Sequence, residues 1–158
     1  MMVDPQPRFI HEPDPEHPGW MRWELSDPTR FNARLGRVIV RLDADGRVRM
    51  RSFPGRGQSN ISGRVHGGAL LGLIDIALFA TARMHGILEA GTAVTVDLST
   101  QFIGAGAIDA PLDLVSEVLR ETRRLVFLRG LAEQEGRVIA AYSGTIRKPA
   151  SRPGSAAA

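Results

Sequence analysis

A single long apolar run constrains the fold of this sequence more than any other feature. Residues 69–82 are almost entirely apolar, and the only charge among them is Asp75. A membrane-spanning helix needs about 20 apolar residues, so a run of this length predicts the buried helix of a soluble domain. Because a carboxylate is costly to bury unless it is paired or functional, Asp75 is the first candidate for a functional residue.

The residues around this run predict one long helix packed in an antiparallel sheet. Apolar positions recur at helical spacing over 65–85. Strand patterns bounded by turn residues lie at 35–42, 47–53, 93–103, 112–120, 125–133 and 138–147. Three links between them are short enough for antiparallel neighbours. Since the helix is apolar nearly all round, the sheet has to curl over it. We therefore predict an α+β hot-dog fold, a curved antiparallel sheet of about six strands wrapped around one long central helix.

The two ends differ in composition from this domain. Residues 1–33 are rich in proline, which favours an extended arm without helix or ladder structure. The candidate anchors of this arm are three aromatic residues, Trp20, Trp23 and Phe31. We expect the domain over 34–148 and a flexible tail over 149–158. The first residues show neither the basic nor the apolar region of a targeting segment, so we expect a cytoplasmic protein without a membrane partner.

Composition excludes several kinds of site. The sequence has 20 basic and 17 acidic residues, and every basic residue except Lys148 is an arginine. These arginines are scattered, whereas nucleic-acid binders cluster theirs, so we expect no nucleic-acid partner. The absence of cysteine excludes disulfides, a thiol nucleophile and zinc–thiolate sites. No His, Asp and Glu residues stand at the spacing of metal ligands, so we also expect no metal.

The start of the predicted helix, His66-Gly67-Gly68, is the second unusual feature. Each glycine weakens a helix by about 1 kcal/mol relative to alanine, which makes sense where another group approaches the backbone closely. The unpaired N–H groups of a helix N-terminus can also bind an oxyanion or a phosphate. His66 and Asp75 are nine residues apart. This spacing places them half a turn out of phase and about 13 Å apart along the axis. If both serve one site, that site has to combine two chains.

A longer motif surrounds these residues. Residues 60–68 read Asn-Ile-Ser-Gly-Arg-Val-His-Gly-Gly and are followed by Asp75, by Thr-Val-Asp-Leu at 95–98 and by Gly-Arg-Val-Ile-Ala at 136–140. This pattern resembles the hot-dog-fold acyl-CoA thioesterases, and in the 4-hydroxybenzoyl-CoA thioesterase superfamily it is most similar to the PaaI-like, phenylacetic-acid-degradation type. The resemblance covers roughly 34–148. It implies hydrolysis of acyl-CoA to a free acid and coenzyme A, with no cofactor beyond the coenzyme A of the substrate. It also implies a homo-oligomer, a dimer or a dimer of dimers, with sites shared between chains.

The resemblance further implies a role for each residue of the motif. Asp75 activates water as a general base or attacks the thioester itself, and the backbone N–H of Gly67 polarises the thioester carbonyl. Asn60 and His66 orient the carbonyl or the water. Thr95 hydrogen-bonds the water or Asp75. Each residue also has a plainer interpretation, as a turn residue, a helix-start residue or an ordinary strand residue.

Other residues are candidates for binding the coenzyme A and acyl parts of the substrate. Gly68 is a candidate for substrate binding beside the expected oxyanion site. Arginine recognises phosphate bidentately, so Arg120, Arg123 and Arg124 are candidates for binding the phosphates of coenzyme A, although we favour a solvated hairpin turn. Four side chains are expected to influence the depth of the acyl pocket: Leu70, Ile74, Phe79 and Met84. Two alternative functions are a non-catalytic acyl-CoA or lipid-binding module and a dehydratase acting on hydroxyacyl thioesters.

Overall fold

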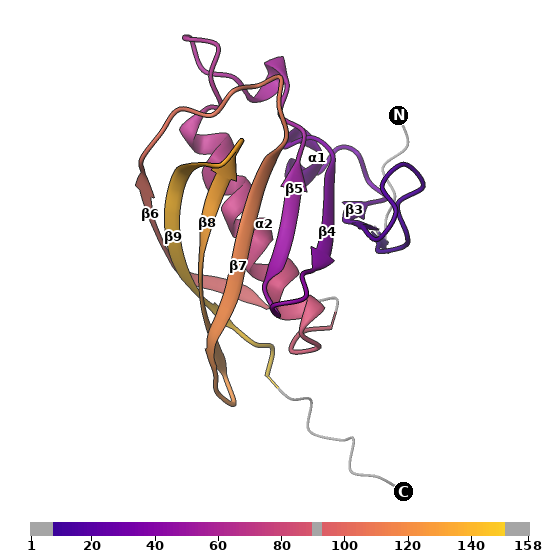
Figure 1. Ribbon diagram of the computed structural model, residues 1–158. Coiled ribbons are helices and arrows are strands. Elements are labelled where there is room, and N and C mark those ends of the chain that lie inside the picture. The colour runs from indigo at the N-terminus through magenta and orange to yellow at the C-terminus, as the bar shows by residue number, and fades with distance from the viewer. Residues whose placement is uncertain (1–7, 90–92, 151–158) are drawn as a thin grey trace, which may run out of the picture.

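One helix lies against a curved sheet at the centre of the molecule (Figure 1). The computed structural model describes residues 8–89 and 93–150, so most of the predicted tail lies outside the described residues. The helix is α2, Gly67–Met84. The long strands are β4 (Val38–Leu42), β5 (Val48–Ser52), β6 (Val94–Phe102), β7 (Leu112–Glu121), β8 (Leu125–Gln134) and β9 (Arg137–Arg147), and a short 3-10 helix, η1 (Arg56–Gln58), follows β5. The predicted hot-dog fold is thereby confirmed.

The sheet has seven strands in the order β2-β4-β5-β7-β8-β9-β6, and all neighbours are antiparallel. Six of them are the strands expected from the sequence. The seventh, β2 (Met21–Arg22), comes from the proline-rich arm and pairs with β4. At the other edge lies β6, whose only neighbour within the described part of the chain is β9.

The arm also forms a small ladder of its own. β1 (Phe9–Ile10) pairs with β3 (Glu24–Leu25), and the four-residue helix α1 (Phe31–Arg34) follows. The expectation that prolines exclude helix and ladder structure from this arm is therefore wrong. Each strand of the arm is two residues long and contains no proline, so its N–H groups can still donate.

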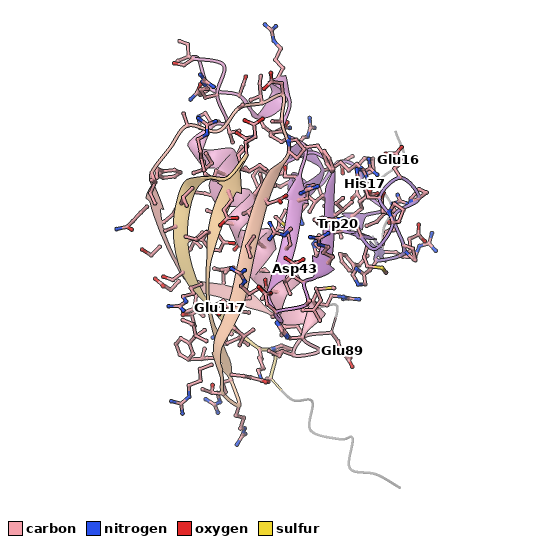
Figure 2. All side chains as sticks on the ribbon, viewed as in Figure 1. Glu16, His17, Trp20, Asp43, Glu89 and Glu117 are labelled. Atoms are coloured by element: carbon pink, nitrogen blue, oxygen red, sulfur yellow. The ribbon has the colours of Figure 1, made fainter. Side chains whose placement is uncertain are left out.

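Tryptophan holds the arm against the outer face of the sheet (Figure 2). Trp20 is 6% exposed, and the guanidinium groups of Arg41 and Arg51 lie 4.5 and 4.9 Å from the centre of its ring. Such stacking of a cation on an aromatic face is attractive. Of the other expected anchors, Trp23 packs against the core from a half-buried position, whereas Phe31 is 66% exposed.

A buried carboxylate provides a second anchor. Asp14 accepts a hydrogen bond from Arg37 (2.6 Å) and another from the ring of His17 (2.9 Å). Burial alone would raise the pKa of Asp14, but these hydrogen bonds outweigh it and hold that pKa well below its usual range. Because Arg37 immediately precedes β4, this ion pair joins the arm to the first long strand.

The core fills the space between α2 and the concave face of the sheet. The buried residues of α2 are Leu70, Leu73, Ile74, Ile76, Ala77, Leu78, Ala80, Thr81 and Ala82. A Cβ atom on Gly144 of β9 would lie 2.4 Å from Cδ1 of Leu78, so only glycine lets the helix approach the sheet this closely. By length and composition α2 could cross a membrane, but half of it is buried inside this domain as the core helix.

Candidate active site

The single charge of the apolar run has a partner on the edge strand. Asp75 lies in the middle of α2 and is half-buried. The hydroxyl of Thr95, the second residue of β6, donates a hydrogen bond of 2.5 Å to Oδ1 of Asp75. The register between β6 and β9 shifts between Thr95 and Asp97, and such bulges re-aim side chains next to functional sites. Packing of β6 beside α2 thus brings together two residues that are 20 positions apart.

Asp75 also lies in the wall of a cavity of about 740 Å³. On one side α2 contributes Asp75, Ile76, Phe79 and Arg83. The N-terminal arm forms the opposite side, from which Trp23 lines the cavity. Most of the lining is apolar, which is usual for a pocket that holds a small organic group. The carboxylate therefore stands at the edge of a space large enough for an acyl group.

The start of α2 is organised by the ring of His66, which is the N-cap residue. Its Nδ1 atom accepts a hydrogen bond of 2.8 Å from the N–H of Gly68. A Cβ atom on Gly68 would lie 3.1 Å from that same nitrogen, so glycine leaves room for the cap. The cap assigns the neutral ring a proton on Nε2, which remains available as a donor. The N–H of Gly67 has no hydrogen-bond partner among the described residues, as expected of an oxyanion donor.

Asn60 shapes the loop that leads to this helix start. Its Oδ1 atom accepts hydrogen bonds from the N–H groups of Ser62 (2.9 Å) and Arg64 (3.0 Å). This is the turn role that was the plainer interpretation of Asn60. Its side-chain NH₂ group has no partner in the described part of the chain and can still donate. Asn60, Arg64 and Gly67 line a second cavity of about 510 Å³.

The predicted catalytic residues are therefore divided between two cavities. Asp75 lines the first, and Asn60 and Gly67 line the second. Gly67 and Asp75 are eight residues apart on one helix, which gives a rise of about 12 Å and a rotation of about a quarter turn between the two positions. The distance along the axis keeps the two residues apart within one chain.

The expected pocket residues separate in the same way. Of the four, Phe79 alone lines the cavity at Asp75, and Leu70 lines the cavity at the helix start. Ile74 is fully buried in the core, and Met84 packs against the core. Helical spacing predicts which positions share an apolar face of the helix. The packing of the sheet then determines which side of the helix stays open to a ligand.

The three arginines proposed for the coenzyme A phosphates lie away from both cavities. Arg120 is the last residue but one of β7, Arg123 and Arg124 lie in its turn with β8, and all three are exposed. This turn is at the bottom of Figure 1, whereas the start of α2 is near the top. None of the three makes an ion pair within the described residues. Their role in binding phosphate remains a prediction.

Two groups of lining residues were missed from the sequence. Arg64 stands inside the motif and lines the cavity at the helix start, but a single arginine in a loop carries little signal. Phe9 and Trp23 line the cavity at Asp75 from the arm. Aromatic residues between prolines indicate that the arm packs against the domain, but they do not indicate which part of the domain it contacts.

A family model described as "Thioesterase superfamily" matches residues 62–141. This span contains the helix start, Asp75 and Thr95, and it leaves out the arm. No curated protein gives a significant match to the sequence.

Several solved structures share the fold. The phenylacetic acid degradation protein PaaI from Thermus thermophilus, solved as a point mutant, is 22% identical with a TM-score of 0.63, over 75% of this chain and 98% of that one. A hypothetical thioesterase protein with coenzyme A from Streptococcus pneumoniae is 22% identical with a TM-score of 0.60, over 68% and 85% of the two chains. Zebra fish thioesterase superfamily member 2 is 24% identical with a TM-score of 0.63, over 75% and 86%.

Proposed function

The chain belongs to the thioesterase superfamily, and from this premise we propose that it hydrolyses acyl-CoA thioesters to a free acid and coenzyme A. The observation that carries the proposal is the pairing of Asp75 with Thr95 in the wall of a mainly apolar cavity. A carboxylate in this position can take a proton from water or attack an acyl carbon itself. The cavity beside it has the size and lining to hold the acyl group.

In the proposed mechanism the two oxygen atoms of Asp75 have different tasks. The Thr95 hydroxyl donates to Oδ1 and holds the carboxylate in place, while Oδ2, which no described residue hydrogen-bonds, accepts a proton from water. The activated water adds to the thioester carbonyl carbon. The C–S bond then breaks, and coenzyme A leaves as a thiol after taking up the proton that Asp75 accepted from water, which returns Asp75 to its carboxylate form. The N–H of Gly67 donates to the carbonyl oxygen as negative charge develops on it, supported by the dipole of α2.

This mechanism needs two chains, because the acid and the oxyanion donor of one chain line different cavities. The exposed edge strand β6 supports such a dimer. Val94 and Phe102, at its two ends, are 43% and 55% exposed. Antiparallel pairing of two β6 strands about a twofold axis at Leu98, the middle residue, would place Val94 of one chain opposite Phe102 of the other.

Such pairing would complete the site. Thr95 follows Val94 directly and binds Asp75, whereas Phe102 lies at ordinary contact distance from the position of a Cβ atom on Gly67. The acid of one chain would therefore approach the helix start of its partner. A further association into a dimer of dimers follows from the family resemblance alone.

The test is the release of free thiol from a panel of acyl-CoAs by the wild-type chain and by Asp75→Asn. Asparagine keeps the shape of the side chain but can neither accept the proton nor attack, so we expect kcat to fall at least about 100-fold. Asp109→Asn, which changes a loop carboxylate outside both cavities, should keep wild-type turnover. Undiminished thiol release by folded Asp75→Asn would contradict the proposal. Binding of acyl-CoA by the wild type without thiol release would instead indicate a binding module.

A further inference from the structure

We propose that the N-terminal arm forms the far wall of the acyl pocket and limits the length of the linear acyl chain that the enzyme accepts. This inference rests on the hydrolysis proposed above and adds to it the element that selects the substrate. The arm lies outside residues 62–141, so its role is not part of what the family match describes. Its contacts with α2 carry the argument.

The arm turns an open side of the helix into a pocket. Asp75, Ile76, Phe79 and Arg83 recur at helical spacing and line one side of the cavity. The sheet packs on the other side of α2, through residues such as Leu78. The side that carries Asp75 is therefore covered by the arm, and the cavity exists in this chain because the arm is docked there.

Contacts between two aromatic rings of the arm hold this wall in place. The rings of Phe9 and Trp23 meet edge to face, with centroids 4.5 Å apart and planes at 73°. The guanidinium of Arg83 lies 4.4 Å from the centre of the Phe9 ring, and Arg83 has no carboxylate within ion-pair distance among the described residues. The β1–β3 ladder places Phe9 opposite Leu25, which also lines the cavity. Phe9 is thus held from the helix, from the neighbouring strand and by a second ring.

The position of the contact between Arg83 and Phe9 limits the length of the acyl chain that the pocket can hold. Arg83 follows Asp75 by eight residues, so the Arg83–Phe9 contact lies about 12 Å further along the helix axis. An extended acyl chain advances by somewhat less than the C–C bond length of about 1.5 Å for each carbon. A chain whose carbonyl lies at Asp75 therefore reaches the wall after about eight to ten carbons. Medium-length apolar acyl groups fit, and longer linear ones meet Phe9.

The experiment compares kcat/KM for octanoyl-CoA and tetradecanoyl-CoA in full-length variants. In the wild type the longer substrate should be at least about tenfold poorer. Phe9→Ala removes the ring and should raise the ratio of tetradecanoyl to octanoyl turnover about tenfold. Leu25→Trp places a larger side chain in the same wall. It should lower kcat/KM for octanoyl-CoA and leave kcat/KM for butyryl-CoA nearly unchanged. The control Phe127→Ala removes a ring of β8 outside both cavities and should leave the ratio at its wild-type value.

Opposite shifts in the two arm variants would support the inference, because general loosening of the arm cannot produce both. An unchanged ratio in Phe9→Ala and an unchanged octanoyl rate in Leu25→Trp, with all substrates still hydrolysed, would overturn the role of the arm alone. Absence of thiol release from every acyl-CoA by the wild type would overturn the proposed hydrolysis as well, so the two failures are distinguishable.

Discussion

At the scale of single residues, the site depends on side chains that hold other groups in place. His66 accepts the N–H of Gly68, whereas the N–H of Gly67 stays without a partner among the described residues. Thr95 binds one oxygen of Asp75 and leaves the other for water. Both act through one hydrogen bond each, which makes their contributions separable by conservative substitution.

Substitution Thr95→Val should test this arrangement. Valine keeps the shape of the side chain but removes the hydrogen bond to a carboxylate, which is worth about 1.5–3 kcal/mol, so kcat should fall about 10- to 150-fold. KM should change little, because the acyl pocket is untouched. Thr95→Ser restores the hydroxyl and should recover most of the turnover. Equal losses in the valine and serine variants, or a lowered unfolding temperature that accounts for the loss, would show that Thr95 serves only packing.

At the scale of elements, the arm is held on by contacts of a different kind from those of the core. It makes two-residue ladders, a stacked tryptophan and the Asp14–Arg37 ion pair instead of burying a long apolar face. Elements held by few buried contacts open more easily than the core. Both tryptophans of the chain, Trp20 and Trp23, lie in the arm, so tryptophan fluorescence reports on its docking.

Docking of the arm should therefore weaken in acid. The pKa of Asp14 is lowered in the fold, so its stabilisation is fully present above the ordinary aspartate pKa of about 3.9 and is lost as pH falls through the lower pKa of the folded state. At pH 7, Asp14→Asn should lower the urea concentration at the midpoint of unfolding, followed by tryptophan fluorescence. The difference between wild type and variant should shrink below about pH 4. A difference that stays constant from pH 7 to pH 2 would exclude Asp14 as the titrating anchor.

At the scale of the whole molecule, the proposed mechanism gives one chain two incomplete sites. The acid lines a cavity that the arm closes, and the oxyanion donor lines another beside Phe102. Pairing of β6 edges would join the acid of each chain to the donor of its partner. Activity in this arrangement belongs to the assembly and can be restored between two defective chains.

Complementation measures this directly. Gly67→Pro removes the donor N–H, and proline is well tolerated at the first position of a helix when the preceding residue is extended, as His66 is. Gly67→Pro and Asp75→Asn should each be nearly inactive. Co-refolded in equal amounts, they should recover about a quarter of wild-type activity, because half of the dimers are mixed and each of these has one intact site. No recovery, with mixed dimers demonstrated by a tag on one chain, would show that each site lies within one chain.

Features that depend on local order can be recognised in the amino-acid sequence. The single charge in the apolar run, the alternating strands and the motif from Asn60 to Gly68 are visible without a structure, because periodicity and turn chemistry involve near neighbours. The half-turn phase between His66 and Asp75 likewise follows from helix geometry alone.

Contacts between distant segments, in contrast, become visible in the three-dimensional fold. It paired Thr95 with Asp75, gave the proline-rich arm its short strands and brought Phe9 into the lining of the same cavity as Phe79. It also showed that the side chain of Ile74 belongs to the core. These outcomes depend on which face of α2 the sheet covers and on contacts between residues far apart in the chain, and neither is encoded in the spacing of neighbours.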